Sequence, residues 1–136
     1  MPAGYLLDTN IVSYFIRGNY PSVRERVVSA PADSLYVSAV TEAELQFWVL
    51  CYPASARTRV GVTDFLLRVP SLPWDSAVAS AYAATRDRLK RTGRTMSATD
   101  LMIAAHALTL GLTLVTHDQA FALVDGMSIE DWTVEG

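Results

Sequence analysis

Four acidic residues lie beside short apolar segments, and these are the side chains whose types and positions could do chemistry. They are Asp8, Glu44, Asp100 and Asp118. The segments around them, LLDTN, SAVTEAEL, SATDLMIAAH and LVTHDQAF, contain no Lys or Arg. Carboxylates that meet without a cation repel one another, and carboxylate oxygens are the ligands that Mg²⁺ and Mn²⁺ prefer. The acids therefore indicate a divalent-metal site if the fold brings them together.

Each acid also fits an ordinary helix cap or turn. TEAE at 41–44 and SATD at 97–100 match the capping box, in which a hydroxyl and a carboxylate three residues later bond reciprocally to backbone N–H groups. Asp8, Thr9 or Asn10 could cap a helix that starts at this point, and THDQ could be a turn. Taken singly these motifs are common. The metal hypothesis therefore rests on the four acids meeting.

The elements that must position the acids alternate along the chain. Apolar runs predict strands in the segments YLLD (5–8), SLYVS (34–38), SLPW (71–74), LTLVT (112–116) and MSIEDW (127–132). Helical periodicity and breakers predict helices at residues 9–18, 21–30, 39–52, 55–69, 75–93 and 97–111. The helix at 97–111 is apolar nearly all round, as a central buried helix would be.

This alternation predicts an α/β fold with a mainly parallel sheet covered on both faces. In such folds the ligand site lies outside the carboxyl ends of the strands, near a topological switch point. Asp8 ends the first strand, and Glu44 lies in the first turns after the second. Asp118 follows the fourth strand, and Asp100 lies in the first turn of the helix that leads into it. All four are expected at one edge of the sheet.

Length and composition are typical of one globular domain spanning residues 1–136. The chain is 51% hydrophobic, and no apolar run approaches the roughly 18 residues of a membrane span. The start MPAGYLLD lacks the features of a secretory signal, and Cys51 is the only cysteine, so we expect a cytoplasmic protein without a disulfide. A formal charge of −3 and a pI of about 5.2 argue against binding nucleic acid by bulk electrostatics.

Several blocks of the sequence, in the right order, resemble a PIN domain and, more narrowly, the VapC-type toxins of toxin–antitoxin pairs. The blocks are LLDTN, YVSAVTEAEL, YAATRDRLKRTGRTMSATDLMIAAHAL, TLVTHDQAF and MSIEDW. This resemblance implies a PIN-like α/β/α sandwich with a five-stranded sheet. It also implies a metal-dependent endoribonuclease whose partners are an RNA substrate, a VapB-type antitoxin and a second copy of the chain.

The resemblance also assigns roles to residues. Asp8, Glu44 and Asp100 would hold one Mg²⁺ or Mn²⁺, and Asp118 would complete that site or help to hold a second ion. Polar helpers that orient the ligands and water would be Thr9, Asn10 and Thr116. Water activated by the metal would attack the RNA phosphorus in line and leave 5′-phosphate and 3′-hydroxyl ends.

A basic strip offers the only obvious track for an RNA backbone. All eleven Lys and Arg residues lie between Arg17 and Arg94, and the strip consists of Arg86, Arg88, Lys90, Arg91 and Arg94. Arg86 stands where VapC-type proteins commonly carry an arginine. The alternative is a solvated helix face, in which Asp87 pairs with Arg91 one turn on.

The histidines and large aromatic residues have ordinary expected roles. His106 is expected to be a packing residue with a satisfied ring, and His117 has no second His or Cys at zinc-ligand spacing. Core or interface positions, in place of base stacking, are expected for Phe47, Tyr14, Trp48, Trp74 and Trp132.

Two other classes of function remain open at this stage. One is a PIN-fold module that binds partners without catalysis. The other is an aspartyl phosphotransfer or receiver-like domain, which also places an aspartate at the end of its first strand. That chemistry needs a lysine near the phosphate, and the only lysine is Lys90, in a basic helix and not at a strand end.

Overall fold

The computed structural model describes residues 4–53 and 56–134. Its five strands are β1 (Tyr5–Leu7), β2 (Leu35–Ser38), β3 (Ser71–Leu72), β4 (Thr113–Val115) and β5 (Ile129–Glu130). Its helices are α1 (Thr9–Arg17), α2 (Pro21–Ser29), α3 (Ala39–Leu50), α4 (Arg57–Arg68), α5 (Ser76–Arg91) and α6 (Ala98–Leu110), with a 3₁₀ helix η1 (Gln119–Leu123). The strands and α-helices predicted from the sequence are thus found, and the expected helix start at residue 55 lies outside the described residues.

All four strand pairings of the sheet are parallel, and the strand order is β3-β2-β1-β4-β5. The chain first builds outward from β1 through β2 to β3, and later places β4 and β5 on the other side of β1. The order therefore reverses between β1 and β4. This topological switch point is where α/β folds bind ligands.

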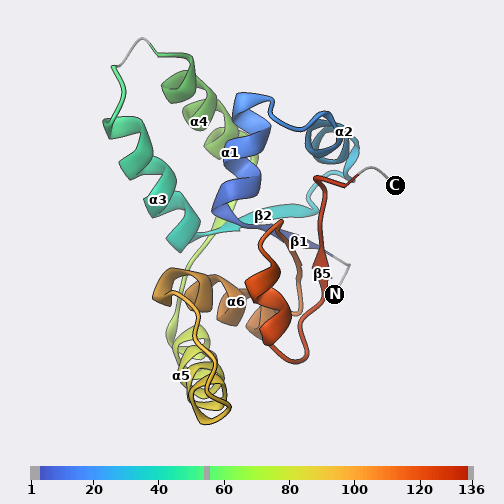
Figure 1. The fold of residues 1–136 in the computed structure, drawn as a ribbon. Coiled ribbons are helices and arrows are strands. Elements are labelled where there is room, and N and C mark those ends of the chain that lie inside the picture. Colours follow the sequence, from blue (N-terminus) through green and yellow to red (C-terminus); the bar gives the residue numbers. More distant parts are fainter. Residues whose placement is uncertain (1–3, 54–55, 135–136) are drawn as a thin grey trace.

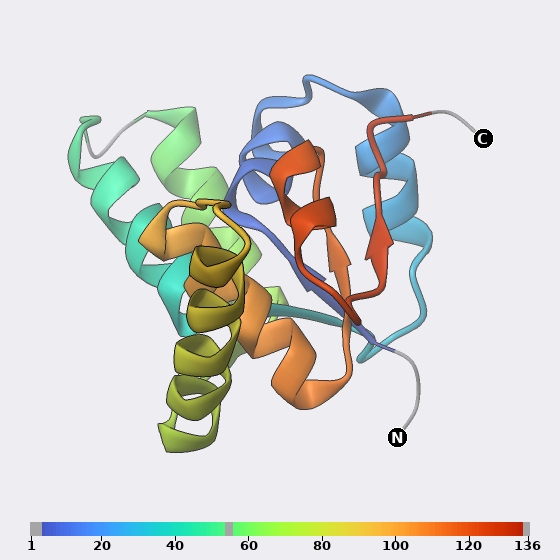
Figure 2. The same ribbon diagram turned by 60° about the horizontal axis from the view of Figure 1, so that its bottom comes forward.

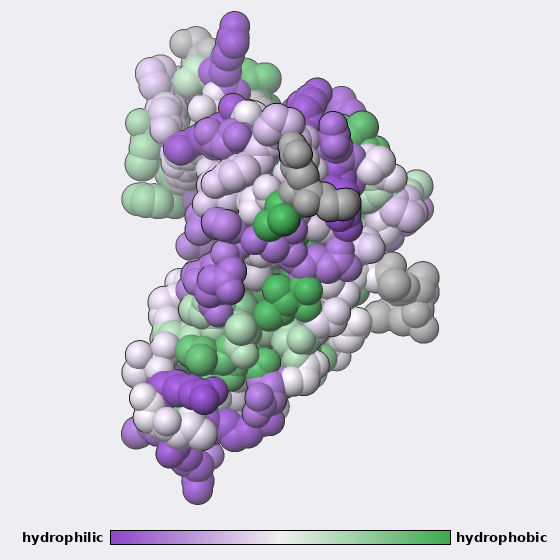
Figure 3. Space-filling model, turned by 45° about the vertical axis from the view of Figure 1, so that its right-hand side comes forward, coloured by the Kyte–Doolittle hydropathy of each residue, from purple (hydrophilic) through white to green (hydrophobic). Residues whose placement is uncertain are grey.

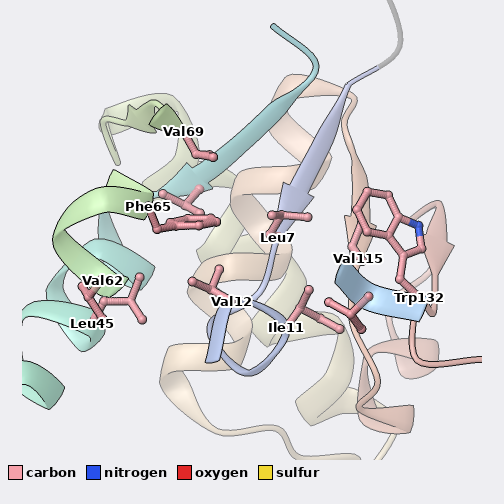
Figure 4. Packing of buried hydrophobic residues seen from close by; sticks show 11 residues of the cluster. Leu7, Ile11, Val12, Leu45, Val62, Phe65, Val69, Val115 and Trp132 are labelled. Atoms are coloured by element: carbon pink, nitrogen blue, oxygen red, sulfur yellow. The ribbon is translucent and has the colours of Figure 1, made fainter. Parts of the chain in front are cut away.

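The sheet is covered on both faces, as the alternation of its side chains requires. Successive strand residues point to opposite faces. Leu7 and Val115 pack into the core cluster with α1 and α4, whereas Leu6 and Leu114 pack into the second cluster with α6. Figure 1 shows α1 to α4 on one side of the strands and α5 and α6 on the other, and Figure 2 shows α5 and α6 side by side. Figure 4 shows the first cluster, with Trp132 against its edge.

The helix ends follow their sequence signals. Gly18 and Gly111 end α1 and α6 with φ of 73° and 66°, the left-handed conformation that glycine adopts without strain. Gly61, inside α4, has a packing reason: a Cβ there would lie 2.9 Å from Ile16 Cγ2 of α1. The sequence did not predict η1, because its five residues are too few to show a helical period.

Candidate active site

Asp8 stands at the centre of the switch point, directly after β1. Its Oδ1 accepts from the Ile11 amide at 2.9 Å, so Asp8 is the N-cap of α1. Its Oδ2 accepts from the Thr116 hydroxyl at 2.5 Å, and the side chain is buried. The capping explanation is therefore correct for Asp8. Capping uses only one of its two oxygens, and the other is bonded to the end of β4.

Thr116 joins two of the acids. Besides donating to Asp8, its Oγ1 accepts from the Asp118 amide at 3.0 Å. Asp118 in turn caps η1, because its Oδ1 accepts from the Ala120 amide at 2.9 Å. The THDQ segment is thus a turn, as the ordinary interpretation has it, and this turn holds Asp118 beside the Asp8 loop.

Three of the carboxylates share one electrostatic field. Burial raises the pKa of Asp8 from 3.8 to about 6; its bonds from Thr116 and Ile11 lower it, and the charges of Asp100 and Asp118 raise it further. Burial also raises the pKa of Asp100, and the charge of Asp118 adds to this rise. These carboxylates are therefore close enough to repel one another. In the part of the chain that the structure describes, none of them forms an ion pair with a cationic side chain.

Glu44 approaches this group through Thr9, the residue after Asp8. The Thr9 hydroxyl donates to Glu44 Oε1 at 2.5 Å and lies 3.1 Å from the Thr41 hydroxyl. The capping-box explanation of 41–44 is wrong, because Ser38 caps α3 and its Oγ accepts from Val40. Glu44 therefore lies one turn further into the helix than a capping residue would.

Asp100 keeps part of its capping role. Ser97 is the N-cap of α6, and its Oγ accepts from the Asp100 amide at 3.1 Å. The first half of the predicted box at 97–100 is thus present.

Asn10 lies exposed in the first turn of α1.

The donor set suits a hard divalent cation in its chemistry. Every acid offers carboxylate oxygens. A cation between them would offset both the burial and the smaller repulsion that raise the pKa values of Asp8 and Asp100. Within residues 4–53 and 56–134, however, no group of three Asp, Glu, His or Cys side chains is placed so that it could hold a metal ion. The side chains must therefore draw together to bind one.

Sequence reasoning missed a polar and aromatic group beside the acids. His117, between Thr116 and Asp118, bonds through Nδ1 to Asp131 Oδ2 at 2.9 Å. Its ring lies 6.2 Å from that of Tyr20, which lies 4.8 Å from that of Tyr14. The sequence carries no clear signal for this bond, because His117 and Asp131 lie fourteen positions apart and no local pattern links them.

The basic strip divides into residues of different surroundings. Arg91 pairs with Asp87 at 2.9 Å, as predicted, and Arg86 donates to the Tyr82 hydroxyl at 3.0 Å. Arg88 and Arg94 line a cavity of about 100 Å³ beside η1. Lys90 is exposed near the end of α5. In Figure 3, hydrophobic residues gather just below the middle of the view, at the height where Figure 1 shows α6 and the 3₁₀ helix η1.

His106 differs in one respect from its expected role. It is buried in α6, and its Nδ1 lies 2.8 Å from Ser38 Oγ, which makes it a packing residue. Its Nε2 has no hydrogen bond of normal geometry among the described residues, so the expected satisfied ring is shown only at Nδ1. Burial lowers the pKa of His106, and the charge of Asp75 and the Pro73 carbonyl partly offset this. Burial therefore disfavours the charged form of this ring.

The aromatic expectations hold in part. Trp132 is buried in the core, and the Trp74 indole donates to the Met102 carbonyl at 3.0 Å. Arg17 lies over the Trp48 ring, 4.8 Å from its centre. Phe47 is 69% exposed, so it belongs to the surface.

A parallel five-stranded sheet with acids at its switch point defines a class of α/β proteins, and comparisons identify the family. The PIN domain model matches residues 5–127. The tRNA(fMet)-specific endonuclease VapC of Shigella flexneri is 34% identical over 130 residues, covering 95% of this chain and 98% of the relative. Ribonuclease VapC1 of Haemophilus influenzae is also 34% identical, with the same coverage. The chain belongs to the PIN-domain family, and within it to the VapC group.

Solved structures agree with this assignment. The DNA-bound VapBC structure from Salmonella typhimurium matches with a TM-score of 0.88 at 30% identity, covering 96% of this chain and 98% of that one. VapBC-1 of nontypeable Haemophilus influenzae matches with a TM-score of 0.84, also at 30% identity and with the same coverage. The PIN-like fold expected from the sequence is thereby confirmed. Among the described residues, no helix is both long and apolar enough to cross a membrane.

Proposed function

We propose that this protein is a Mg²⁺- or Mn²⁺-dependent endoribonuclease that acts as the toxin of a toxin–antitoxin pair. The observation that carries the proposal is the coupling of Asp8, Asp100 and Asp118 at the β1–β4 switch point, where burial and mutual repulsion raise two of the pKa values. Among the described residues, none of these acids has an ion-pair partner. The names of the VapC relatives support RNA as the substrate. A structural cap alone does not account for the unneutralised charge.

The residues have distinct tasks in this reaction. Asp8, Asp100 and Glu44 would hold the ion, and Asp118 would complete the site or help to hold a second ion. When bound, the ion supplies positive charge to the phosphorane-like transition state and makes water a stronger nucleophile. The Thr116 and Thr9 hydroxyls fix Asp8 and Glu44 in orientation. Asn10 would orient water or a phosphate oxygen from its exposed position.

The protein's setting and partners belong to the same proposal. Residues 1–136 form a single PIN domain that works in the cytoplasm. A VapB-type antitoxin inhibits it, as the VapBC complexes among its structural neighbours suggest.

A homodimer is supported by apolar residues exposed on neighbouring helices, Phe47 and Leu50 of α3 and Val60 and Leu67 of α4. Sedimentation velocity tests it, since a monomer at every concentration would contradict a dimer.

Cleavage of RNA by the purified chain tests the activity. The first substrate is initiator tRNA, because the Shigella relative is named for it. We expect cleavage with Mg²⁺ or Mn²⁺, none with EDTA, and 5′-phosphate ends on the products. RNA that stays intact with either metal, or cleavage that EDTA leaves unchanged, contradicts the proposal.

A matched pair of variants separates the site from the helix that carries it. Glu44→Gln removes the charge of the proposed ligand. Glu42→Gln makes the same change two residues away, at an exposed side chain that accepts a hydrogen bond from Gln46. We expect at least about a hundredfold loss of cleavage in the first and none in the second. Equal activities would remove Glu44 from the site.

A further inference from the structure

Three aromatic rings form a continuous group on one flank of the acids. Tyr14 lies on α1, Tyr20 precedes α2, and His117 lies in the turn after β4. Their ring centres are 4.8 Å apart for the tyrosines, tilted by 60°, and 6.2 Å apart for Tyr20 and His117, tilted by 47°. Both tyrosines are partly exposed, and His117 is exposed. The group thus presents ring surface to the outside.

The His117 ring is held in one orientation by two residues that follow β5. Its Nδ1 is 2.9 Å from Asp131 Oδ2 and 3.0 Å from Thr133 Oγ1, so the segment after β5 fixes the ring plane. Thr133 also donates to Asp131 Oδ1 at 2.6 Å. A ring that is 48% exposed yet bonded on one edge is pre-organised for contact on its other side.

The group lies next to the acids both in the chain and in space. His117 is flanked by Thr116, which bonds to Asp8, and by Asp118. The pKa of Tyr14 is raised by burial first, then by Tyr20, and then by the charges of Asp8, Asp131 and Asp118. A phosphodiester at the acids would therefore have its neighbouring nucleotide beside these rings.

The cations nearest in sequence on this flank are already engaged. Arg17 lies over Trp48, and Arg24 lies 5.9 Å from the centre of the Phe15 ring. Arg26 makes an ion pair of 2.9 Å with Glu130. Base stacking needs no cation, and aromatic side chains are the usual platforms for unpaired RNA bases.

We infer that Tyr14, Tyr20 and His117 form a stacking surface for an unpaired nucleobase next to the scissile phosphate. This inference rests on the proposed ribonuclease function. It assigns Asp131 as a positioning residue that acts through His117. Tyr14 packs against the first core cluster, as expected, and the inference adds a second role for its exposed part. It also gives this flank a part in choosing single-stranded over paired RNA.

Paired changes in protein and RNA test the inference. Cleavage of a single-stranded oligoribonucleotide is compared with that of copies in which one base next to the cut is replaced by an abasic site. With the wild-type chain we expect abasic substitution to raise KM about tenfold. With Tyr20→Leu or His117→Leu we expect the KM for the intact RNA to rise while kcat stays close to the wild-type value. In these two variants, replacing the base by an abasic site should change KM little further. Tyr20→Phe, which keeps the ring, should behave as wild type.

The controls separate this inference from folding and from the proposed function. Tyr52→Leu alters a tyrosine paired with Trp48 at the far end of α3, and its KM should stay unchanged. Thermal melting confirms that each variant is folded. Stacking is measured without cleavage by placing 2-aminopurine next to the cut in the RNA and following the quenching of its fluorescence on binding to the Asp100→Asn chain. Wild-type cleavage with unchanged KM in both Leu variants overturns the inference alone. Absence of any wild-type cleavage overturns the proposed function instead.

Discussion

The Thr116 hydroxyl donates to Asp8 Oδ2 across 108 positions of the sequence and accepts from the Asp118 amide two residues on. One side chain therefore fastens the carboxyl ends of β1 and β4 together at the point where the strand order reverses. Any ligand of these acids meets an arrangement that Thr116 helps to set.

Replacing Thr116 by Val removes both bonds while keeping the shape of the side chain. The pKa of Asp8 should rise further, because the Thr116 bond lowers it, and the Asp118 amide loses its acceptor. We expect a tenfold to hundredfold loss of cleavage or metal affinity, about the usual effect of a residue that orients a ligand. Thr116→Ser should restore most of it. A fully active Val variant would show that this bond does not position the site.

Asp8→Asn should separate stability from activity. Asn keeps an oxygen for the Ile11 amide but removes a buried charge whose pKa is about 6 instead of 3.8. In the metal-free protein at pH 7 this charge costs up to about 3 kcal/mol, so the variant should be more stable and also inactive. Chemical denaturation with EDTA present measures the change. A less stable variant would mean that the bond from Thr116 stabilises the charge of Asp8 by more than its burial costs.

The pH dependence of stability has a definite sign. The pKa of Asp8 is higher in the folded chain than in the unfolded one, so the folded state binds the proton more tightly. The free energy of unfolding of the metal-free protein should therefore fall as pH rises from about 4 to about 6. The curve for Asp8→Asn provides the reference, because groups that are not coupled to Asp8, such as His106, contribute equally to both curves. Parallel curves would contradict the raised pKa.

Arg94→Glu tests the part of the basic strip that faces the cavity beside η1. If RNA phosphate passes there, the variant should raise KM about tenfold, reduce the salt dependence of binding by about one ion, and leave metal affinity unchanged. Arg68→Glu is the control, because Arg68 pairs with Asp64 on α4. Equal KM values for both variants would favour the solvated-face interpretation of the strip.

Much of the fold could be predicted from local signals. The runs YLL and TLV, the breakers at Gly18 and Gly111, and the apolar α6 lie where periodicity and propensity place them. Strand order depends on long-range pairing, which a single sequence does not display. The 3₁₀ helix η1 was not predicted, because its five residues are too few to show a helical period.

The candidate site was predictable in its residue types and not in its contacts. The rule that ligands bind at strand ends brought Asp8 and Asp118 to one edge without any coordinates. The sequence placed the start of α3 correctly at residue 39. The contact of Glu44 with Thr9 depends instead on how α1 and α3 pack against each other, which no local pattern displays. The His117–Asp131 bond joins two loops, and no local pattern indicates such a bond.

Manganese binding tests the central claim most directly. Crystals of the chain soaked in Mn²⁺ should show an anomalous peak between the carboxylates of Asp8 and Asp100, with Glu44 drawn in, and Asp8→Asn crystals should lack it. A wild-type crystal with no peak there, at a Mn²⁺ concentration that supports cleavage, would contradict the account.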